Sequence, residues 1–525
     1  MFSIVKELAP KQFLNDIIAG IVVAIIALPL SIALALASGV EPVCGIYTAI
    51  AAGFIVSLLG GSRIQIAGPT AAFATIVAGI VATQGMDGLF IATILAGIIL
   101  MLMGVFKLGS LIKFIPSTIT TGFTAGIAVT IFIGQIKDFL GIQYSQGVSP
   151  IETIEKLVAN FEFMSTLSFQ ALFVGVVCLG ILIIYPKFEK RVPPSLVSVI
   201  VGVLMVKFIP ALDKGVFTIN ELYTVKAGLP SVDFAAMDFS LNKIMAVMPN
   251  AFTIAILAAI ESLLSCVVAD GMVNSKHNSN MELVAQGAGN IASVLFGGIP
   301  ATGAIARTAA NAKNGGRTPI AGMVHAVVLL IILLFAMPLA GLIPMPAIAA
   351  ILFMVAYNMS EGKNFAYIIK TAPKSDSVVM VVTFALTVIF DLVIAIEVGL
   401  LLALILFMKR MSDEARVACE VKDKATVYEI SGPMFFGMAD KIAKVKPTEN
   451  TNCVILHMDG VVAIDATAIN SLKQLHKKCK GKGVKLALSH VSPQPMKAMK
   501  KSGFYESVGE ENFYNCVEDA LLVVS

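Results

Sequence analysis

Two short stretches, far apart in the chain, resemble one another and decide how the fold is interpreted. The first is GGSRIQIAGPTAA, residues 60–72, and the second is GGIPATGAIARTAA, residues 297–310. Each begins with Gly-Gly and ends in Thr-Ala-Ala, and Gly, Thr and Pro interrupt each of them within an apolar neighbourhood. Short interrupted segments at corresponding places in two halves of a chain are typical of the binding site of a transporter built from inverted repeats. The pair therefore predicts two related halves that meet at a site.

The composition indicates a membrane protein. The chain has 525 residues, of which 57% are hydrophobic and 14% are charged, whereas soluble domains average about a quarter charged residues. This excludes a disordered chain, a nucleic-acid-binding protein and an ordinary soluble enzyme. A helix needs about 20 apolar residues to cross a bilayer. Apolar runs near that length lie at 17–38, 42–60, 88–106, 117–138, 170–186, 194–210, 248–268, 281–297, 319–341, 345–358, 376–393 and 394–411.

Charge marks the domain boundary. Residues 409–525 contain 17 of the 38 Lys and Arg and 14 of the 34 Asp and Glu. Together with the interrupted segments 69–82 and 301–312, the apolar runs predict an α-helical polytopic membrane protein with 14 transmembrane segments in a 7+7 inverted repeat. The expected parts are a membrane domain at 1–411, with repeat one at 12–210 and repeat two at 245–411, a linker at 412–424 and a soluble domain at 425–525.

The soluble tail has the pattern of a small α/β domain. Strand-like runs at 426–430, 453–457 and 484–488 alternate with helix-like runs at 436–445, 466–479 and 495–502, and such alternation is typical of α/β folds. The tail has neither a phosphate-binding Gly-rich loop nor the pattern of a catalytic triad. A docking or regulatory module is therefore expected.

Basic residues in short loops predict the orientation. Lys107, Lys313, Arg317 and the Lys409-Arg410 pair fall on one side if there are 14 segments, while the loop at 341–344 on the other side has no Lys or Arg. Cytoplasmic loops carry the excess of Lys and Arg. Both termini and the soluble domain are thus expected in the cytoplasm.

No cofactor or metal is expected. The seven Cys form no CxxC pair and have no zinc-ligand spacing with His. No cluster of nucleophile, base and metal ligands indicates an enzyme. His277 and His325 are each alone in the sequence and are expected to make ordinary polar contacts.

Several motifs resemble the SulP anion transporters, the bacterial relatives of the SLC26 family. They are ALPL at 27–30, GVEP at 39–42, GGSR at 60–63, GPTAA at 68–72, ESLL at 261–264 and TGAIARTA at 302–309. The tail resembles a STAS domain, with VAID at 462–465 leading into a helix. The run from 270 to 290 is similar to members that carry C4-dicarboxylates in enteric bacteria.

The resemblance implies an architecture and a place in the cell. A core domain of spans 1–4 and 8–11 slides in an elevator-like motion against a gate domain of spans 5–7 and 12–14. Segments 3 and 10 become half-helices whose N-termini face one another at the membrane midplane. The resemblance also implies a homodimer, formed through the gate and STAS regions, in the cytoplasmic (inner) membrane of a bacterium.

The residues themselves suggest how an anion is bound. A helix N-terminus carries a partial positive charge and free N–H groups, so two that face each other form an anion site; Pro69 suits the first turn of such a helix. Arg307 either adds positive potential near the anion or reaches from a helix end to the interface. The substrate-binding residues expected are Ser31, Gln65, Pro69, Thr70, Ala71, Phe73, Thr302, Gly303, Ala304, Ile305 and Arg307.

Glu261 is a lone carboxylate within an apolar span. It either takes up the coupling ion or is a structural counter-ion of Arg307. The resemblance implies Asp at the matching place in sodium-dependent bicarbonate carriers, so the Glu counts against sodium coupling.

The expected function is secondary active transport of sulfate or a similar inorganic anion together with protons. The alternatives are a C4-dicarboxylate (succinate or fumarate) symporter, a sodium-coupled bicarbonate transporter, a membrane sensor that signals through the STAS domain, and a channel. The sequence does not select the anion, because helix dipoles attract any compact anion.

Overall fold

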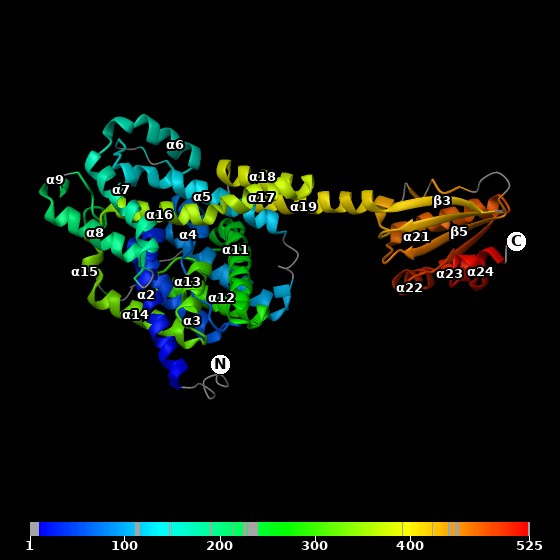
Figure 1. Ribbon diagram of the computed structural model, residues 1–525, viewed down its shortest axis with the longest axis horizontal. Coiled ribbons are helices and arrows are strands. Elements are labelled where there is room, and N and C mark those ends of the chain that lie inside the picture. The colour runs from blue at the N-terminus through cyan, green and yellow to red at the C-terminus, as the bar shows by residue number, and fades with distance from the viewer. Residues whose placement is uncertain are drawn as a thin grey trace. The chain divides into compact units, whose positions relative to one another are not determined.

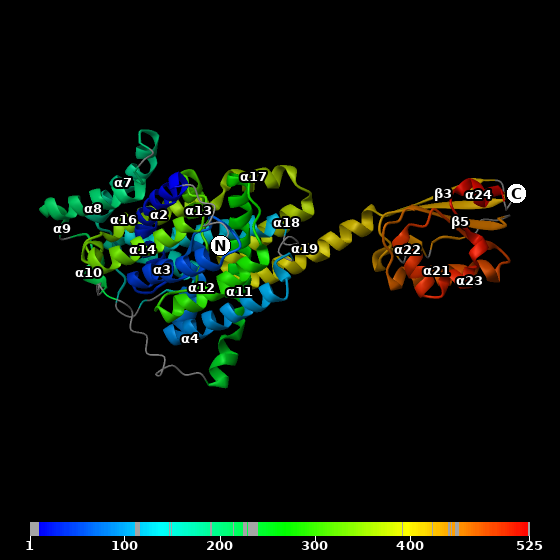
Figure 2. The same cartoon turned by 90° about the horizontal axis from the view of Figure 1, so that it is seen from below.

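The computed structural model describes residues 10–110, 116–145, 148, 150–189, 192–213, 215–223, 228, 240–390, 392–422, 424–438, 441–442, 444–446 and 451–522. The chain divides into two compact units, Met1–Leu400 and Leu401–Ser525. Each unit is described by itself below, and Figures 1 and 2 label their elements in two views.

The first unit is almost entirely helical. Its helices, 3-10 turns and two short strands are α2 (Pro10–Ala37), α3 (Pro42–Leu59), β1 (Ala67–Gly68), α4 (Ala71–Val105), α5 (Ser117–Leu140), α6 (Thr153–Glu162), η2 (Met164–Thr166), α7 (Phe169–Ile184), η3 (Tyr185–Lys187), α8 (Pro194–Phe208), α9 (Pro210–Asp213), α10 (Ile219–Leu222), α11 (Leu241–Val273), α12 (Ser279–Leu295), β2 (Thr302–Gly303), α13 (Ile305–Lys313), α14 (Ile320–Phe335), α15 (Met337–Ala340), α16 (Met345–Ser360), α17 (Gly362–Thr371) and α18 (Lys374–Ile389). Helix α19 (Leu392–Glu414) begins in the first unit and ends in the second.

Many of these helices are suited to a membrane. Among the described residues, seven are both long and apolar enough to cross one, and two shorter apolar helices accompany them. Helix α4 is interrupted at Gly85, where φ is 74° and ψ is −179°, a conformation that glycine adopts without steric cost. The break separates residues 71–84 from 86–105, which matches the predicted short segment and the span after it. The count of 14 spans stays a prediction.

The helices of the first unit pack as two groups. Helices α2, α3, α4, α11, α12, α13 and α14 contact one another, and helices α5, α7, α8, α16 and α18 form the second group. The membership agrees with the expected core and gate domains. Within the first group, a Cβ added at Gly287 of α12 would meet the backbone oxygen of Gly97 in α4. Small residues of this kind let membrane helices approach closely.

Strands β1 and β2 join the two repeats. They pair antiparallel, with Ala67 opposite Gly303 and Gly68 opposite Thr302, and a helix begins shortly after each strand. The N-cap residues of these helices are Thr70 and Ala304.

This correspondence corrects the alignment of the two stretches. Thr70 stands before the first residue of α4, whereas Thr308 lies inside α13, about one turn beyond its N-cap residue. The shared Thr-Ala-Ala letters are therefore not structurally equivalent. What the two repeats share is a short strand that is followed closely by the start of a helix.

The second unit contains a five-stranded sheet with the order β3-β4-β5-β6-β7. Strand β3 is antiparallel to β4 and the remaining pairs are parallel. Its elements are β3 (Arg416–Lys422), β4 (Ala425–Ser431), η5 (Phe436–Met438), β5 (Cys453–Gly460), α21 (Ala466–Gly481), β6 (Lys485–Ser489), α22 (Pro493–Lys501), α23 (Phe504–Val508), η6 (Glu510–Asn512), β7 (Phe513–Tyr514) and α24 (Val517–Leu522).

Alternating side chains build a core on each face of this sheet. Val454 and Leu456 of β5 lie in the larger cluster with Leu472 of α21, whereas Ile455 lies in the smaller cluster with Ala520 of α24. This is the alternation expected of a strand buried on both faces. The predicted α/β domain is confirmed.

Two boundary predictions for the tail need correction. The described residues of the predicted linker at 412–424 lie mostly in regular elements, because α19 continues to Glu414 and β3 occupies Arg416–Lys422. Strand β3 is mostly exposed and carries charged residues at Arg416, Glu420 and Lys422, so its short apolar alternation was not taken as a strand. Within the predicted helix at 436–445, the described part includes the 3-10 turn Phe436–Met438, and residues 439, 440 and 443 lie outside the described residues.

Candidate functional site

Arg307 is a buried cation in the interior of the first unit. Only 1% of its surface is exposed. Its Nη2 donates to Ser31 Oγ at 3.3 Å and to the backbone oxygen of Pro69 at 3.2 Å, while its Nε and Nη1 have no hydrogen-bond partner among the described residues. The alternative that Arg307 reaches to the interface is wrong. A buried cation with unused donors is costly unless an anion accompanies it.

Glu261 of α11 links both repeats through a single oxygen. Its Oε2 accepts hydrogen bonds from Thr70 Oγ1 at 2.9 Å and from Thr302 Oγ1 at 3.1 Å. Among the described residues, the ion pairs do not join Glu261 to Arg307. The alternative of a Glu261–Arg307 counter-ion pair is therefore not supported in this conformation. The carboxylate and the guanidinium have separate partners around one region, where the paired strands β1 and β2 lead into α4 and α13. This region is called the junction.

The two helix starts add electrostatic potential to this junction. Neither Thr70 nor Ala304 caps its helix with a side-chain hydrogen bond. First-turn amides of an uncapped helix carry partial positive charge and attract anions. Pro69 lies outside α4 rather than in its first turn, which corrects its predicted role, and its carbonyl serves instead as a partner of Arg307.

Several predicted site residues point elsewhere or are already paired. The Gln65 amide donates to Glu282 Oε1 at 2.8 Å, so the prediction that it faces the anion is wrong here. The backbone N–H of Gly303 donates to Ser262 Oγ, and that of Ala304 donates to the Ile66 oxygen. These two amides are therefore engaged.

The remaining candidates differ in exposure. Phe73 has no exposed surface, which assigns its ring to core packing. Ala71, the first residue of α4, is 6% exposed, whereas Ile305, the first residue of α13, is 43% exposed. Ser31, Pro69, Thr70, Thr302, Glu261 and Arg307 are thus the predicted residues that direct hydrogen bonds link at the junction.

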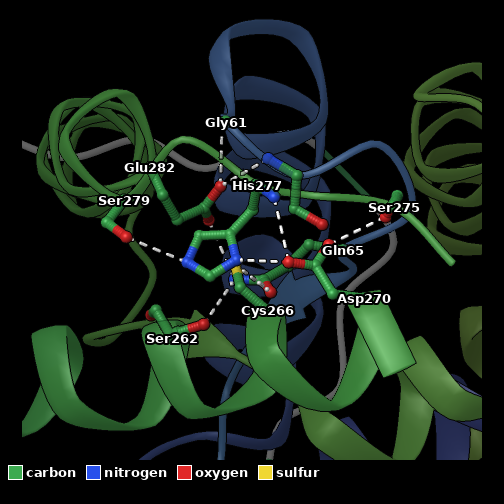
Figure 3. A network of polar contacts seen from close by, with 10 residues as sticks. Gly61, Gln65, Ser262, Cys266, Asp270, Ser275, His277, Ser279 and Glu282 are labelled. Atoms are coloured by element: carbon green, nitrogen blue, oxygen red, sulfur yellow. Dashed lines mark hydrogen bonds and ion pairs between the residues drawn. The ribbon is translucent and has the colours of Figure 1, made fainter. Parts of the chain in front are cut away.

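Sequence reasoning missed a second buried carboxylate, Glu282 of α12. It is fully buried and accepts four hydrogen bonds, from the backbone N–H groups of Gly61 and Ser62 and from the side chains of Gln65 and Gln286. Figure 3 shows this carboxylate beside Gly61. A Glu within a short apolar run, followed by Gln one helical turn later, was the available signal.

Two further buried polar side chains were misjudged or overlooked. Asp16 of α2 is fully buried and accepts from Arg317 N at 2.8 Å and from Thr318 Oγ1 at 2.6 Å. His325 of α14 is also fully buried, and neither ring nitrogen has a partner in the described part of the chain. No group of three His, Cys, Asp or Glu able to hold a metal ion occurs among the described residues.

The apolar helices and the buried cationic junction between two opposed helix starts define a class: a multi-pass membrane protein that handles anions. The sulfate permease family profile matches residues 13–383, and the STAS domain profile matches residues 416–520. The chain belongs to the sulfate permease (SulP) family of anion transporters and has a C-terminal STAS domain.

Relatives and solved structures agree with this assignment. The putative sulfate transporter YvdB of Bacillus subtilis is 40% identical over 523 residues, which cover 96% of each chain. The bicarbonate transporter BicA of Picosynechococcus is 29% identical and covers 99% of this chain and 96% of that protein. A structure of SLC26A9 is 17% identical, with a TM-score of 0.88 over 100% of this chain and 92% of that chain. At that identity, it supports the fold alone. These relatives are transporters, and the chain is not an enzyme.

Proposed function

We propose that this protein is a secondary active transporter that carries sulfate or a similar inorganic anion together with protons. The observation that carries the proposal is Arg307, buried with two unused donor groups beside two uncapped helix starts. A compact oxyanion accepts hydrogen bonds from a guanidinium fork and from helix amides at the same time. The relative YvdB, at 40% identity, is named a putative sulfate transporter.

Glu261 is the proposed proton carrier. Both threonine hydroxyls donate to Oε2, so the proton would occupy Oε1 while the two hydrogen bonds persist. An ionised carboxylate beside a bound anion is repulsive, and protonation removes that repulsion. Binding of the anion and protonation of Glu261 therefore favour one another.

An elevator-like motion is the proposed transport step. The linked residues lie on the first helix group and on the segments that join its elements: Ser31 is in α2, Glu261 in α11 and Arg307 in α13, Thr302 is in β2, and Pro69 and Thr70 lie between β1 and α4. A site built within one group travels with that group when it slides against the other. This arrangement supports alternating access without dismantling the site.

The proposed setting is the inner membrane of a bacterium, with both termini and the STAS domain in the cytoplasm and with a homodimer as the working unit. The basic residues Lys107, Lys313 and Arg317 in short loops support the orientation. The proposed domains remain a membrane part followed by a STAS part, with the boundary at the α19–β3 junction rather than at a linker.

Uptake of labelled sulfate into proteoliposomes tests the function. An inward proton gradient should drive accumulation, and excess unlabelled sulfate should compete better than bicarbonate or succinate. A second candidate, sodium-coupled bicarbonate transport, is favoured by the BicA relatives; it predicts bicarbonate as the best competitor and a requirement for a sodium gradient. No uptake of any of the three anions by folded protein would contradict both candidates and favour a sensor.

The substitution Gly68→Ala should weaken sulfate binding by displacing the Arg307 guanidinium, without removing any binding group. A Cβ at this position would collide with Arg307 Nη1, so the guanidinium must shift. Overpacking of this kind costs about 1–3 kcal/mol. We expect a lower melting temperature and about a tenfold or greater loss of affinity in calorimetric titration, which corresponds to about 1.4 kcal/mol.

Gly79→Ala is the matched control for this substitution. Gly79 lies in α4, and a Cβ there meets nothing within 4 Å. Wild-type affinity is expected for this variant. Equal affinity of both variants would show that the position of the guanidinium does not matter for binding.

A further inference from the structure

A second chemically distinctive group lies at the turn between α11 and α12. His277 Nδ1 is 2.7 Å from Asp270 Oδ2, and His277 Nε2 is 3.0 Å from Ser279 Oγ. Figure 3 shows the imidazole between the carboxylate and the hydroxyl. The chain of contacts, carboxylate to Nδ1 and Nε2 to a serine hydroxyl, is the one by which hydrolytic enzymes activate a nucleophile. Geometry and not position in the sequence identifies such a group.

The carboxylate of this group is held firmly. Asp270 Oδ1 accepts from Ser275 Oγ at 2.8 Å, and Oδ2 accepts from the His277 backbone N–H at 2.9 Å in addition to the ring. The side chains of His277 and Asp270 are only 11% and 18% exposed. This fixed and mostly buried carboxylate keeps the imidazole proton on Nδ1, so the lone pair of Nε2 faces the Ser279 hydroxyl.

The serine opens into a polar pocket. Ser279, His277, Lys276 and Ser110 are among the residues that line an open surface depression of about 410 Å³. The volume admits a small molecule, and the Lys276 ammonium favours one that carries negative charge. The group is separate from the Arg307 junction and takes no part in the proposed transport step.

We propose that Ser279 is an activated nucleophile and a site of covalent acylation by a small acyl donor with an anionic leaving group, of the acyl phosphate class. Ser279 Oγ attacks the carbonyl carbon while its proton passes to His277 Nε2. The bond between the carbonyl carbon and the phosphate oxygen then breaks, and the departing phosphate takes the proton from His277. The product is an ester on Ser279, and no oxidant or reductant is required.

The proposal is a modification and not turnover. Efficient acyl transfer requires N–H donors aimed at the developing oxyanion. Gly61, which lines the pocket, already gives its N–H to Glu282. The Lys276 ammonium then attracts the oxyanion without that Gly61 donor, so the ester forms but is hydrolysed slowly. A transporter can use a stable acylated state as a modification, whereas an enzyme has to release the acyl group in order to turn over.

A fluorophosphonate probe, which reacts with activated serines, tests the nucleophile on the purified full-length protein. Peptide mass spectrometry should find the label on Ser279, at a rate at least about 100-fold above that of Ser110 in the same pocket, because a positioned general base contributes about 10²–10⁴-fold. Ser279→Ala should take up no label, His277→Gln should lose at least about 100-fold in rate, and the matched control Ser110→Ala should react as wild type. Heat-unfolded protein should not be labelled at Ser279.

Asp270→Asn provides a second variant if His277→Gln fails to fold, because it keeps the ring and removes only its orienting charge. It should also slow labelling. Acetyl phosphate then tests the substrate class, and the acetyl group is expected on Ser279. Absence of the probe from Ser279 in folded protein, equal labelling of Ser110, a wild-type rate in either variant, or acetylation of Lys276 instead of Ser279 would overturn the proposal. None of these results depends on whether the protein carries sulfate.

Discussion

Arg307→Ala is expected to reduce sulfate affinity by about 30-fold or more, which corresponds to about 2 kcal/mol. The guanidinium is 1% exposed and leaves Nε and Nη1 unpaired among the described residues, so these donors are available to an anion. Alanine removes the charge and the donors together. Removing one partner of a buried charged contact costs about 2–5 kcal/mol. Calorimetric titration of the purified protein, with its melting temperature, measures the loss.

Two further variants separate charge from packing at this position. Arg307→Lys should retain part of the affinity, because an ammonium keeps the positive charge but lacks the planar fork. Ser31→Ala removes one hydrogen-bond acceptor of the guanidinium and leaves the other, the Pro69 oxygen; it should weaken binding less than Arg307→Ala. An Arg307→Ala protein that folds and binds sulfate as wild type does would remove the residue from the site.

The sequence predicted where the two helices begin better than it predicted which side chains bond to one another there. Two interrupted apolar segments were enough to indicate a site shared by both halves, because such interruptions rarely occur in a membrane helix without a cavity to line. That two helix N-termini meet there was implied by the family resemblance. The hydrogen-bond partners could not be read in the same way. Gln65 lies only a few residues before Thr70, yet its amide bonds to Glu282 and the Thr70 hydroxyl bonds to Glu261.

That difference arises from long-range packing. The partner of Gln65 lies 217 positions away in the chain and the partner of Thr70 lies 191 positions away. No local pattern encodes which of two nearby polar side chains meets which distant carboxylate. The same limit explains Glu282, whose four donors come from the segment before β1 and from its own helix.

Exposure explains the missed strand in the tail. Strand β3 pairs with β4 along its whole length, from Arg416 opposite Ser431 to Lys422 opposite Ala425. Its side chains are nevertheless mostly exposed. Val417, Cys419 and Val421 alternate with more polar residues, but of these only Val417 packs against the core. The exposed, charged run therefore resembles a linker in sequence, and the backbone ladder identifies it as an edge strand.

Glu261→Gln is expected to abolish accumulation driven by a pH gradient while anion exchange and stability persist. The glutamine oxygen can accept the two hydrogen bonds that Oε2 accepts from Thr70 and Thr302, so the junction is retained. The amide cannot take up or release a proton, so the permanently neutral variant behaves as if always loaded. Exchange of labelled for unlabelled sulfate then continues, but the proton gradient no longer does work on the anion.

A purely structural Glu261 predicts a different result. If its carboxylate were required only to hold Thr70 and Thr302 together, Gln would leave both exchange and gradient-driven uptake near wild type, and Glu261→Ala would lower the melting temperature, since a buried hydroxyl left unpaired costs about 1–3 kcal/mol. Melting temperature, exchange and gradient-driven uptake measured on one preparation of each variant distinguish the two roles. Because Glu261 and Arg307 have separate partners, the double variant Glu261→Gln, Arg307→Ala should be no more stable than Arg307→Ala alone. Gradient-driven uptake by Glu261→Gln at the wild-type level would refute the coupling role, and recovery of stability in the double variant would restore the ion pair as the explanation.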